Sequence, residues 1–345
     1  MKFLFDRLNP LDVVTNAPDA YVPATKPQPQ RWLQCPQRND EIKALCQPNG
    51  LKHLLYGTLP HFSLYGAGLC LQLMVDTLWA NIGLSVLMGW QLYVLFVLHH
   101  DCMHGSAFRA DFFNRLWGRI YASTFTMTFM VNRQTHMRHH AYISDPERDP
   151  DEYYFAARLR SIWLRLWRYY EWYTRIALTR YGRKVRNTVL SEQGINLGLW
   201  AVVHVVLFAL GMGIKALYIF WLPLAVVALV INPITRGYEH SPITLYPKGD
   251  PRRRDMSMNA ITVSNPVYGW LCANISFHVE HHAYPRCPFY NLQKLHRIFQ
   301  EEKLQYLVAP YPLYRVWKGG RMTATMTCNA DATPLLAQGS ARAAG

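Results

Sequence analysis

The chain has few cysteines, the residues that form the disulfides of small secreted proteins and hold iron–sulfur clusters. Its 345 residues include seven cysteines, an odd number, and no CxxC pair. A disulfide scaffold is not expected in a chain of this length, so the cysteines indicate a reducing compartment. The first residues, MKFLFDRLNPLDVV, lack a long apolar core followed by a small-residue cleavage site. We therefore expect no secretory signal peptide.

Acidic residues are scarce relative to basic ones. There are 22 Asp and Glu against 36 Lys and Arg, which gives a formal net charge of +14. Such an excess suggests an anionic partner, either nucleic acid or a membrane surface. The basic residues occur with 11 Trp and 21 Tyr beside apolar runs, a mixture typical of the membrane interface. We expect membrane lipid as the partner and no nucleic acid.

Four apolar stretches are each about 20 residues long, enough to cross the hydrocarbon core of a bilayer as a helix. Within each pair the connection is very short, Asp76–Thr77 in the first and Ile214–Lys215 in the second. The expected fold is an all-α integral membrane protein in which four transmembrane helices form two hairpins. The expected spans are residues 54–74, 78–98, 195–213 and 216–233.

The chain is expected to consist of three parts: an N-terminal arm, a membrane domain and a tail. Residues 1–50 are polar and contain several prolines, which predicts a cytosolic N-terminal arm. Residues 51–318 form the membrane domain, and residues 319–345 resemble a disordered tail. Within the domain, residues 105–135 are expected to lie at the membrane surface or to insert partly. The Arg- and Trp-rich segment 157–187 predicts a helix in the interface plane, with a solvated helix on a soluble core as the alternative.

The distribution of Lys and Arg predicts the orientation in the membrane. Seven precede the first span, fifteen lie between the hairpins, thirteen follow the second hairpin, and one, Lys215, lies in a hairpin tip. Positive charge accumulates on the cytoplasmic side of a membrane. Both termini and the central loop are therefore expected in the cytoplasm, most simply at a bacterial inner membrane.

Eight of the 14 histidines fall in three windows of five residues. These windows are HDCMH (His100, His104), HMRHH (His136, His139, His140) and HVEHH (His278, His281, His282). Side chains at i, i+3 and i+4 share one helical face, so each window can direct two or three imidazoles to one point. His240, just after the fourth span, is a ninth candidate. All nine fall on the expected cytoplasmic side, and their number suits two metal ions.

The other histidines are weaker candidates for metal ligands. His53, His61, His204 and His296 occur singly, and an isolated histidine near a membrane interface is usually a polar tip without a metal. His99 directly precedes the first window, and we leave it out of the ligand set. Burying eight clustered imidazoles without partners would be costly, so the clusters themselves predict metal binding.

The residue types restrict the metal. Imidazole suits zinc, copper, iron and nickel. HExxH, the helix signature of zinc proteases, is absent, and no thiolate set suggests an iron–sulfur cluster. Bis-histidine haem ligation would use two or four histidines and no contiguous HxxHH triplets. A neutral ligand set large enough for two ions favours non-haem iron that reacts with O₂.

The order HxxxH, HxxHH, HxxHH with paired spans resembles the membrane fatty acid desaturase superfamily, whose relatives include acyl hydroxylases, carotenoid ketolases and alkane monooxygenases. HDCMHGSAF is similar to the family's first histidine box, and HMRHH with the acidic DPERDPDEYY after it is similar to the second. NISFHVEHHAYPRCPFYNLQKLH is similar to the third box of bacterial acyl desaturases, and YEH at 238–240 resembles a motif that completes the iron shell. The resemblance covers about residues 50–300.

The resemblance implies a helical stem and a cytosolic cap that holds two irons. It implies an enzyme that uses O₂ and two external electrons to remove hydrogen from an unactivated C–H bond, most simply in a fatty acid or other acyl or alkyl chain. No HPGG motif of a fused cytochrome b5 occurs, so a separate ferredoxin, rubredoxin or cytochrome with its reductase is expected as the electron donor. The basic cytosolic face suits such an acidic carrier.

Acidic residues beside the boxes could orient the ligating imidazoles, because such rings usually donate their second N–H to a carboxylate or carbonyl. The candidates are Asp101, Glu239 and Glu280, which lie beside ligand positions, and Asp145, Asp149 and Asp151, which follow the second window. Neighbouring residues on a helix point about 100° apart, so Asp101 and Glu280 could instead face away. Asn274, four residues before His278, fits a structural role better than a water-mediated contact with the metal.

Three other functions stay open. Desaturation and hydroxylation share the first hydrogen abstraction, so a hydroxylase or a carotenoid ketolase would show the same boxes. A desaturase of a small specialised metabolite, for example an amino-acid-derived one, would also show them, since no acyl-carrier site is recognisable. A histidine-rich metal transporter fits less well, because transporters place their ligands inside the spans.

Overall fold

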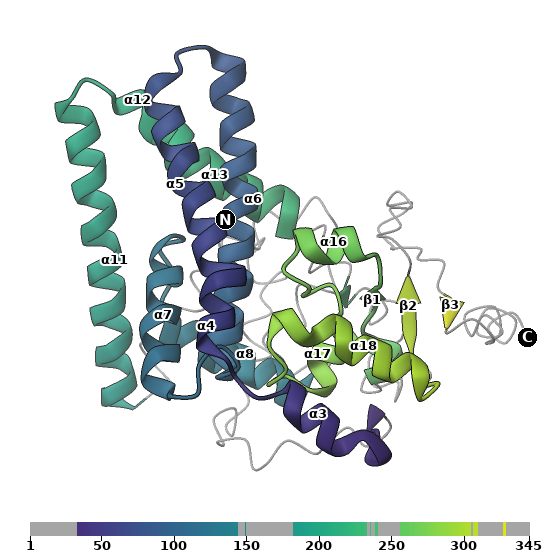
Figure 1. Cartoon of the computed structure of the whole chain (residues 1–345). Helices are drawn as coiled ribbons and strands as arrows, with labels where there is room; N and C mark the ends of the chain where they lie inside the picture. Colours follow the sequence, from purple (N-terminus) through teal and green to yellow (C-terminus); the bar gives the residue numbers. More distant parts are fainter. Residues whose placement is uncertain are drawn as a thin grey trace, which may run out of the picture.

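The structure, a computed structural model, describes residues 33–143, 149, 182–232, 235, 239–240, 256–304, 306–309 and 327–328. The described part is mostly helical (Figure 1). The predicted interfacial helix at 157–187 lies almost wholly outside the described residues, as do most of the N-terminal arm and most of the predicted tail. Of that tail only Thr327–Cys328 are described, and their backbone forms β3.

Long apolar helices form a stem. Two of them, α5 and α6, make the first hairpin, and α11 with a segmented helical run makes the second, so that both hairpin turns lie at the same end (Figure 1). The π-helical segments in this stem are η3, η5 and η6. The bounds are α4 (Gly50–His53), η3 (Leu54–Thr58), α5 (Leu59–Met74), α6 (Leu78–His104), α11 (Arg183–Ala209), α12 (Gly213–Ala216), η5 (Leu217–Trp221), α13 (Leu222–Val226) and η6 (Val227–Ile231).

Three helices of the described chain are long and apolar enough to cross a membrane: Leu78–His104, Arg183–Ala209 and Gly213–Ile231. The α-helical part of α5 is only 16 residues long, because the helix that begins at Gly50 passes through a π-helical segment first. Two helices also differ in extent from the predicted spans. Helix α6 continues through the first histidine window to His104, and α11 begins at Arg183, well before residue 195.

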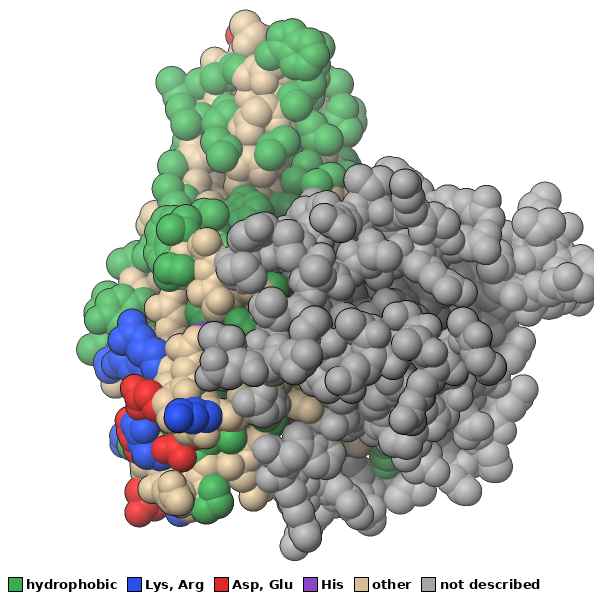
Figure 2. Space-filling view, turned by 90° about the vertical axis from the view of Figure 1, so that its right-hand side faces the viewer, with side chains coloured by type: hydrophobic (Ala, Val, Ile, Leu, Met, Phe, Trp, Pro, Cys, Tyr) green, Lys and Arg blue, Asp and Glu red, His purple; other side chains and the backbone are tan. Residues whose placement is uncertain are grey.

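The stem presents apolar side chains to its surroundings. In the space-filling view hydrophobic side chains predominate over the upper part of the molecule, and most of the visible charged ones gather near the lower end (Figure 2). Helix α7 (Asp111–Ser123) continues this surface with an exposed apolar face that includes Phe112, Phe113 and Leu116. Its opposite face is buried through Gly118 and Tyr121. An amphipathic helix of this kind suits the interface, as predicted for this part of the chain.

A buried lysine joins the two hairpin turns. The Nζ of Lys215 donates hydrogen bonds to the carbonyl oxygen of Val75 and to Asn81 Oδ1, the latter at 3.3 Å, and lies 3.6 Å from Asp76 Oδ1. A lysine is rarely buried unless its charge is partnered. These contacts fix the second hairpin against the first at the end of the stem far from the histidines.

A smaller body, here called the head, packs beside the lower end of the stem (Figure 1). Its own hydrophobic cluster contains Leu33, Ile42, Cys287, Leu295 and Phe299. The head comprises η2 (Pro36–Arg38), α3 (Asn39–Leu45), α15 (Met256–Asn259), β1 (Thr262–Val263), α16 (Pro266–Leu271), α17 (His278–Ala283), η9 (Phe289–Asn291), α18 (Leu292–Glu301), β2 (Leu307–Ala309) and β3 (Thr327–Cys328).

The head contains a small sheet that the all-α prediction did not include. Strand β1 pairs in parallel with β2, with Thr262 opposite Val308, and β2 pairs antiparallel with β3, with Val308 opposite Thr327. The strands are only two or three residues long, too short for an alternating pattern to show in the sequence.

Candidate metal centre

Three helices bring the histidine windows together. The first window forms the last turn of α6, which ends at Gly105 in the left-handed conformation with φ +69°. The second lies in α8 (Phe129–Tyr142), which packs against α6. The third is α17, a helix of six residues in the head. The site therefore lies where the stem, α8 and the head meet.

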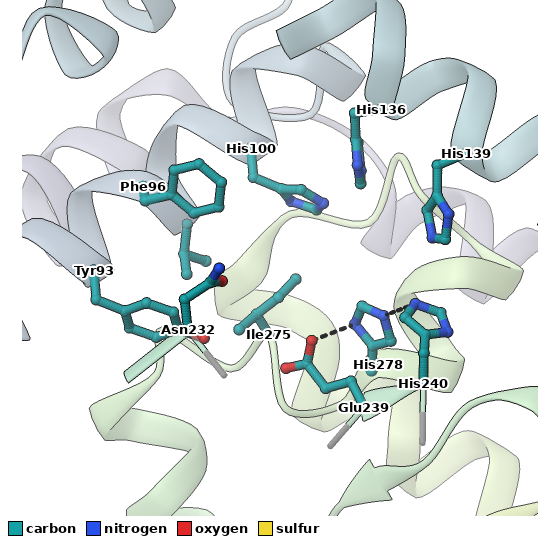
Figure 3. Close-up of a pocket in the computed structure, with 11 residues that line it drawn as sticks. Tyr93, Phe96, His100, His136, His139, Asn232, Glu239, His240, Ile275 and His278 are labelled. Atoms are coloured by element: carbon teal, nitrogen blue, oxygen red, sulfur yellow. Dashed lines mark hydrogen bonds and ion pairs between the residues drawn. The ribbon is translucent and has the colours of Figure 1, made fainter. Parts of the chain in front are cut away.

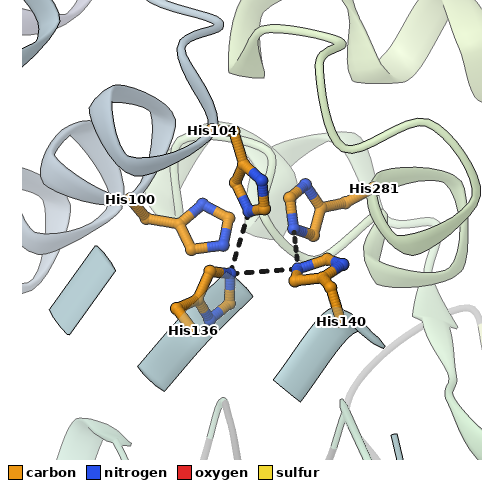
Figure 4. Close-up of side chains that lie close together, drawn as sticks. All are labelled: His100, His104, His136, His140 and His281. Atoms are coloured by element: carbon orange, nitrogen blue, oxygen red, sulfur yellow. Dashed lines mark hydrogen bonds between the residues drawn. The ribbon is translucent and has the colours of Figure 1, made fainter. Parts of the chain in front are cut away.

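Five imidazoles converge at one point, and we call them the five-histidine group. Their nearest ring nitrogens all lie within 4.8 Å of one another, and all three windows contribute (Figure 4). The Nε2 of His136 is 2.9 Å from that of His104 and 3.0 Å from that of His140. The group consists of His100, His104, His136, His140 and His281.

A second set, the four-histidine group, adjoins the first. The ligand atoms of His139, His240 and His282 lie within 4.8 Å of one another. The Nε2 of His278 joins them, 2.7 Å from that of His240 and 3.0 Å from that of His282. All nine histidines that the sequence singles out thus occur in one of the two groups, and the second and third windows contribute to both.

The geometry and protonation of these rings fit a metal ion in each group. Ligand nitrogens about 2.1 Å from one ion and at right angles lie about 3 Å apart, close to the separations found here. Only a neutral imidazole offers a lone pair. Burial is the largest of the causes that lower the pKa of four rings well below the usual range, those of His136, His140, His281 and His282. Converging neutral Nε2 atoms without a cation would bring lone pairs together.

Two of the predicted acids, Asp149 and Glu239, contact ring nitrogens of the groups, and Asp145 and Asp151 lie outside the described residues. Asp149 Oδ1 lies 2.8 Å from His139 Nδ1, with both side chains buried. Glu239 Oε2 lies 3.4 Å from His278 Nδ1 (Figure 3). A carboxylate that accepts a hydrogen bond from Nδ1, as Asp149 does from His139, holds the proton there and turns Nε2 toward the centre of the group, while Glu239 lies at ion-pair distance from His278.

The other two acids face away from the groups. Asp101 Oδ2 accepts from the backbone N–H of Phe289 at 3.0 Å and lies 3.9 Å from His53 Nδ1. Glu280 Oε1 accepts from His296 Nδ1 at 2.5 Å and from the hydroxyl of Tyr306 at 2.7 Å. Each carboxylate instead contacts residues outside the groups, since adjacent positions on a helix point about 100° apart.

The remaining histidines lie outside both groups. His99 is buried with both ring nitrogens engaged, since Nδ1 donates to the carbonyl of Gly118 at 2.8 Å and Nε2 accepts from Asn132 Nδ2 at 3.2 Å. The expectation of interfacial polar tips was wrong for His53 and His296, which are fully buried beside Asp101 and Glu280. His61 and His204 are partly buried and hydrogen-bond within the stem. Asn274, at φ +57°, donates to the carbonyl of Phe289 at 3.1 Å.

Sequence reasoning missed a buried acid that holds α8 in place. Glu192 on α11 accepts from Arg119 Nε at 2.6 Å and from the backbone N–H of Met130 at 2.9 Å. Met130 is in the first turn of α8, where backbone N–H groups lack helical partners, and Thr128 at the N-cap supplies no side-chain bond. Glu192 lies in a polar stretch of α11 with no motif around it, so nothing in the sequence marks it.

A cavity of about 40 Å³ adjoins both groups on the side of the stem (Figure 3). Its apolar walls come from Tyr93, Phe96 and Val97 of α6 and from Ile275. His100 and His136 of one group and His139, His240 and His278 of the other close the far side. Apolar side chains of the stem and candidate ligands from both histidine groups therefore line one small cavity.

Known proteins are similar to this chain in sequence. The family model for fatty acid desaturase matches residues 77–315. Dihydrorhizobitoxine desaturase of Bradyrhizobium elkanii is 23% identical over 258 residues, which are 63% of this chain and 70% of that protein. The chloroplastic omega-3 fatty acid desaturase of Glycine max is 25% identical over 229 residues, 59% of this chain and 51% of that protein.

Proposed function

Because the chain belongs to the fatty acid desaturase family, we propose that it is an O₂-dependent di-iron desaturase that introduces a double bond into an alkyl or acyl chain, in the first place of a fatty acid or lipid. The observation that carries this proposal is the pair of adjoining histidine groups, five rings and four, which supply neutral nitrogen ligands for two ions. Two bound irons would supply the reduction of O₂ and the oxidising power needed to remove hydrogen from an unactivated C–H bond.

The protein's own residues would bind the two ions, orient the ligating rings and shield the site from water. The five-histidine and four-histidine groups hold the ions, and Asp149 and Glu239 fix the rings of His139 and His278. Phe96, Val97 and Ile275 present an apolar surface on the stem side. An alkyl segment of the substrate would lie against this surface, where water is excluded and its C–H bonds face the histidine groups.

The arrangement in the membrane follows from the same features. The two hairpin turns share one end of the stem, and the helices that carry the second and third histidine windows, α8 and α17, lie toward the other (Figure 1). We propose that helix α5 with η3 crosses as well, which gives four spans, and that the histidine side with both termini is cytoplasmic at a bacterial inner membrane. Electrons would come from a separate ferredoxin, rubredoxin or cytochrome with its reductase.

Two alternatives share this site. A hydroxylase or ketolase of a lipid or carotenoid would use the same first abstraction step. The similarity to a protein named dihydrorhizobitoxine desaturase supports a second substrate class, a small specialised metabolite.

Expression in a bacterium with a compatible electron donor tests the proposal. Lipids and metabolites are compared by mass spectrometry between the wild type and His281→Ala. A wild-type-specific product that lacks two hydrogens supports desaturation and identifies the substrate. A product with one added oxygen would replace the proposal by hydroxylation. An iron-loaded protein that leaves every lipid unchanged but converts a supplied metabolite would move the substrate to the second class.

A further inference from the structure

Helix α16 of the head carries three exposed apolar side chains on one face. Val267 is 66% exposed, Trp270 71% and Leu271 37%, and their spacing of i, i+3 and i+4 places them together. The opposite face of the helix is buried at Gly269. The sequence around the helix, from 256 to 277, contains no Asp, Glu, Lys, Arg or His. An apolar patch on an uncharged segment indicates a surface that contacts something other than water.

A hydrogen bond ties α16 to a helix that is long and apolar enough to cross a membrane. Trp90 Nε1 of α6 donates to the carbonyl oxygen of Leu271, the last residue of α16, at 2.9 Å. Helix α6 begins at Leu78, directly after a turn with the exposed Asp76, which marks one membrane surface. At 1.5 Å per residue, Trp90 lies about 18 Å along the helix from Leu78. The hydrocarbon core is about 30 Å thick, so this hydrogen bond lies within it, in the half nearer the histidine windows.

The ends of α16 are closed in the way that a lipid environment requires. A helix end at membrane depth is tolerated only where its free backbone groups find partners. At the first end Asn265 Oδ1 accepts from the backbone N–H of Tyr268 at 3.0 Å, and Pro266 has no N–H to satisfy. At the last end the indole of Trp90 supplies the donor for the carbonyl of Leu271. Both caps therefore suit a short helix surrounded by acyl chains.

We propose that α16 is immersed in the leaflet on the side of the histidine windows, with Val267, Trp270 and Leu271 against lipid acyl chains. The stem continues the same surface, because Leu87, one helical turn before Trp90, is 64% exposed. Figure 1 shows α16 on the side of the head toward the hairpin turns, with α17 and α18 on the other side. A helix of six residues is too short to span, so it enters and leaves the same leaflet.

The immersed helix is continuous with one wall of the cavity beside the histidine groups. Ile275, which lines that cavity, follows the last residue of α16 by four positions. Tyr93, which lines it from α6, contacts the ring of Trp90 with centroids 6.1 Å apart. Lipid contact at α16 therefore holds both walls in place. The proposal requires α6 to cross the bilayer, but it is independent of the reaction at the histidine groups.

Photo-crosslinking tests the proposal on the full chain in nanodiscs of phosphatidylcholine and phosphatidylglycerol. p-Benzoylphenylalanine replaces Trp270, and lipid adducts on the peptides are measured by mass spectrometry after irradiation. The matched positions are Leu87, exposed on the stem, and Gln300, exposed on α18. The yield at Trp270 should equal that at Leu87 and exceed that at Gln300 several-fold. The measurement needs neither iron nor substrate, so its failure would leave the proposed desaturation untouched.

A second comparison needs no probe. Trp270→Asp would place a charge at lipid depth and should lower the melting temperature in nanodiscs, whereas Gln300→Asp on the water-exposed helix should not. The proposal is overturned if Trp270 gives no more lipid adducts than Gln300, if it crosslinks to a second copy of the chain in place of lipid, or if the two Asp variants melt alike. Absence of lipid adducts at Leu87 would also overturn it, because α6 would then not cross the bilayer.

Discussion

His140 stacks on His282 with ring centroids 4.2 Å apart and planes inclined by 20°. One ring belongs to the five-histidine group and the other to the four-histidine group, so this contact is one of those that link the two. A substitution of either ring should therefore affect both groups.

We expect His140→Ala to lose most of the bound iron and all of the activity while the stem stays folded. The Nε2 of His140 lies 3.0 Å from that of His136 and 3.2 Å from that of His281, so its removal opens the five-histidine group and also unstacks His282. Iron per chain and the circular dichroism spectrum are the measurements. His204→Gln, which changes a histidine in the stem, should keep its iron. An iron content in His140→Ala equal to that of this control would remove His140 from the site.

Asp149→Ala should weaken iron binding or activity by about tenfold to a hundredfold, the usual effect of losing a carboxylate behind a ligating histidine. The buried Asp149 carboxylate, 2.8 Å from His139 Nδ1, fixes the proton and the ring of His139. A titration of apoprotein with iron measures the change. The control is Asp111→Ala, because Asp111 pairs only with arginines at the surface of α7 and α8 among its described partners. Equal affinities in the two variants would contradict the role of Asp149.

Glu192→Ala should lower the free energy of unfolding by about 1–3 kcal/mol, because it leaves the Met130 N–H and the Arg119 guanidinium without their buried acceptor. Since α8 carries three of the candidate ligands, iron content should fall too. Glu192→Gln retains an acceptor, so its free energy of unfolding should lie between those of Glu192→Ala and the wild type. If α8 were held by its packing alone, Glu192→Ala would bind iron as tightly as the wild type.

Lys215→Met should destabilise the stem by about 1–3 kcal/mol without loss of iron at low temperature. The substitution keeps the length of the side chain but removes the donors that join the second hairpin to Val75 and Asn81. The melting temperature in detergent is the measurement. Lys184→Met, at an exposed position of α11, is the matched control, and an equal melting temperature in both variants would show that the buried contacts contribute nothing.

The apolar helices and the histidine windows can be predicted from the sequence, but the way they are arranged in space cannot. Hydropathy identifies the apolar helices because lipid requires about 20 such residues in a row. The spacing of the histidines predicts that each window acts from one face, and the structure brings all nine rings together. Spacing carries no information on which window faces which, so the division into five and four could not be predicted.

The acidic residues near the histidine windows show the same limit of prediction from the sequence. Asp101 and Asp149 look equivalent in the sequence, yet only Asp149 reaches a ring nitrogen of the two groups, because its position depends on where the chain returns after α8. Glu192 and the short strands could not be predicted either. Both depend on contacts between segments far apart in the chain, and neither has a local pattern.

Helix α6 runs without a break from the hairpin turn to His104, a length of 27 residues or about 40 Å. His100 and His104 thus lie at the end of one long apolar helix, while α17 of the head supplies His278, His281 and His282. A bilayer of different thickness changes the tilt of such a helix. We therefore expect the position of the first histidine window relative to α17 to depend on the thickness of the surrounding bilayer.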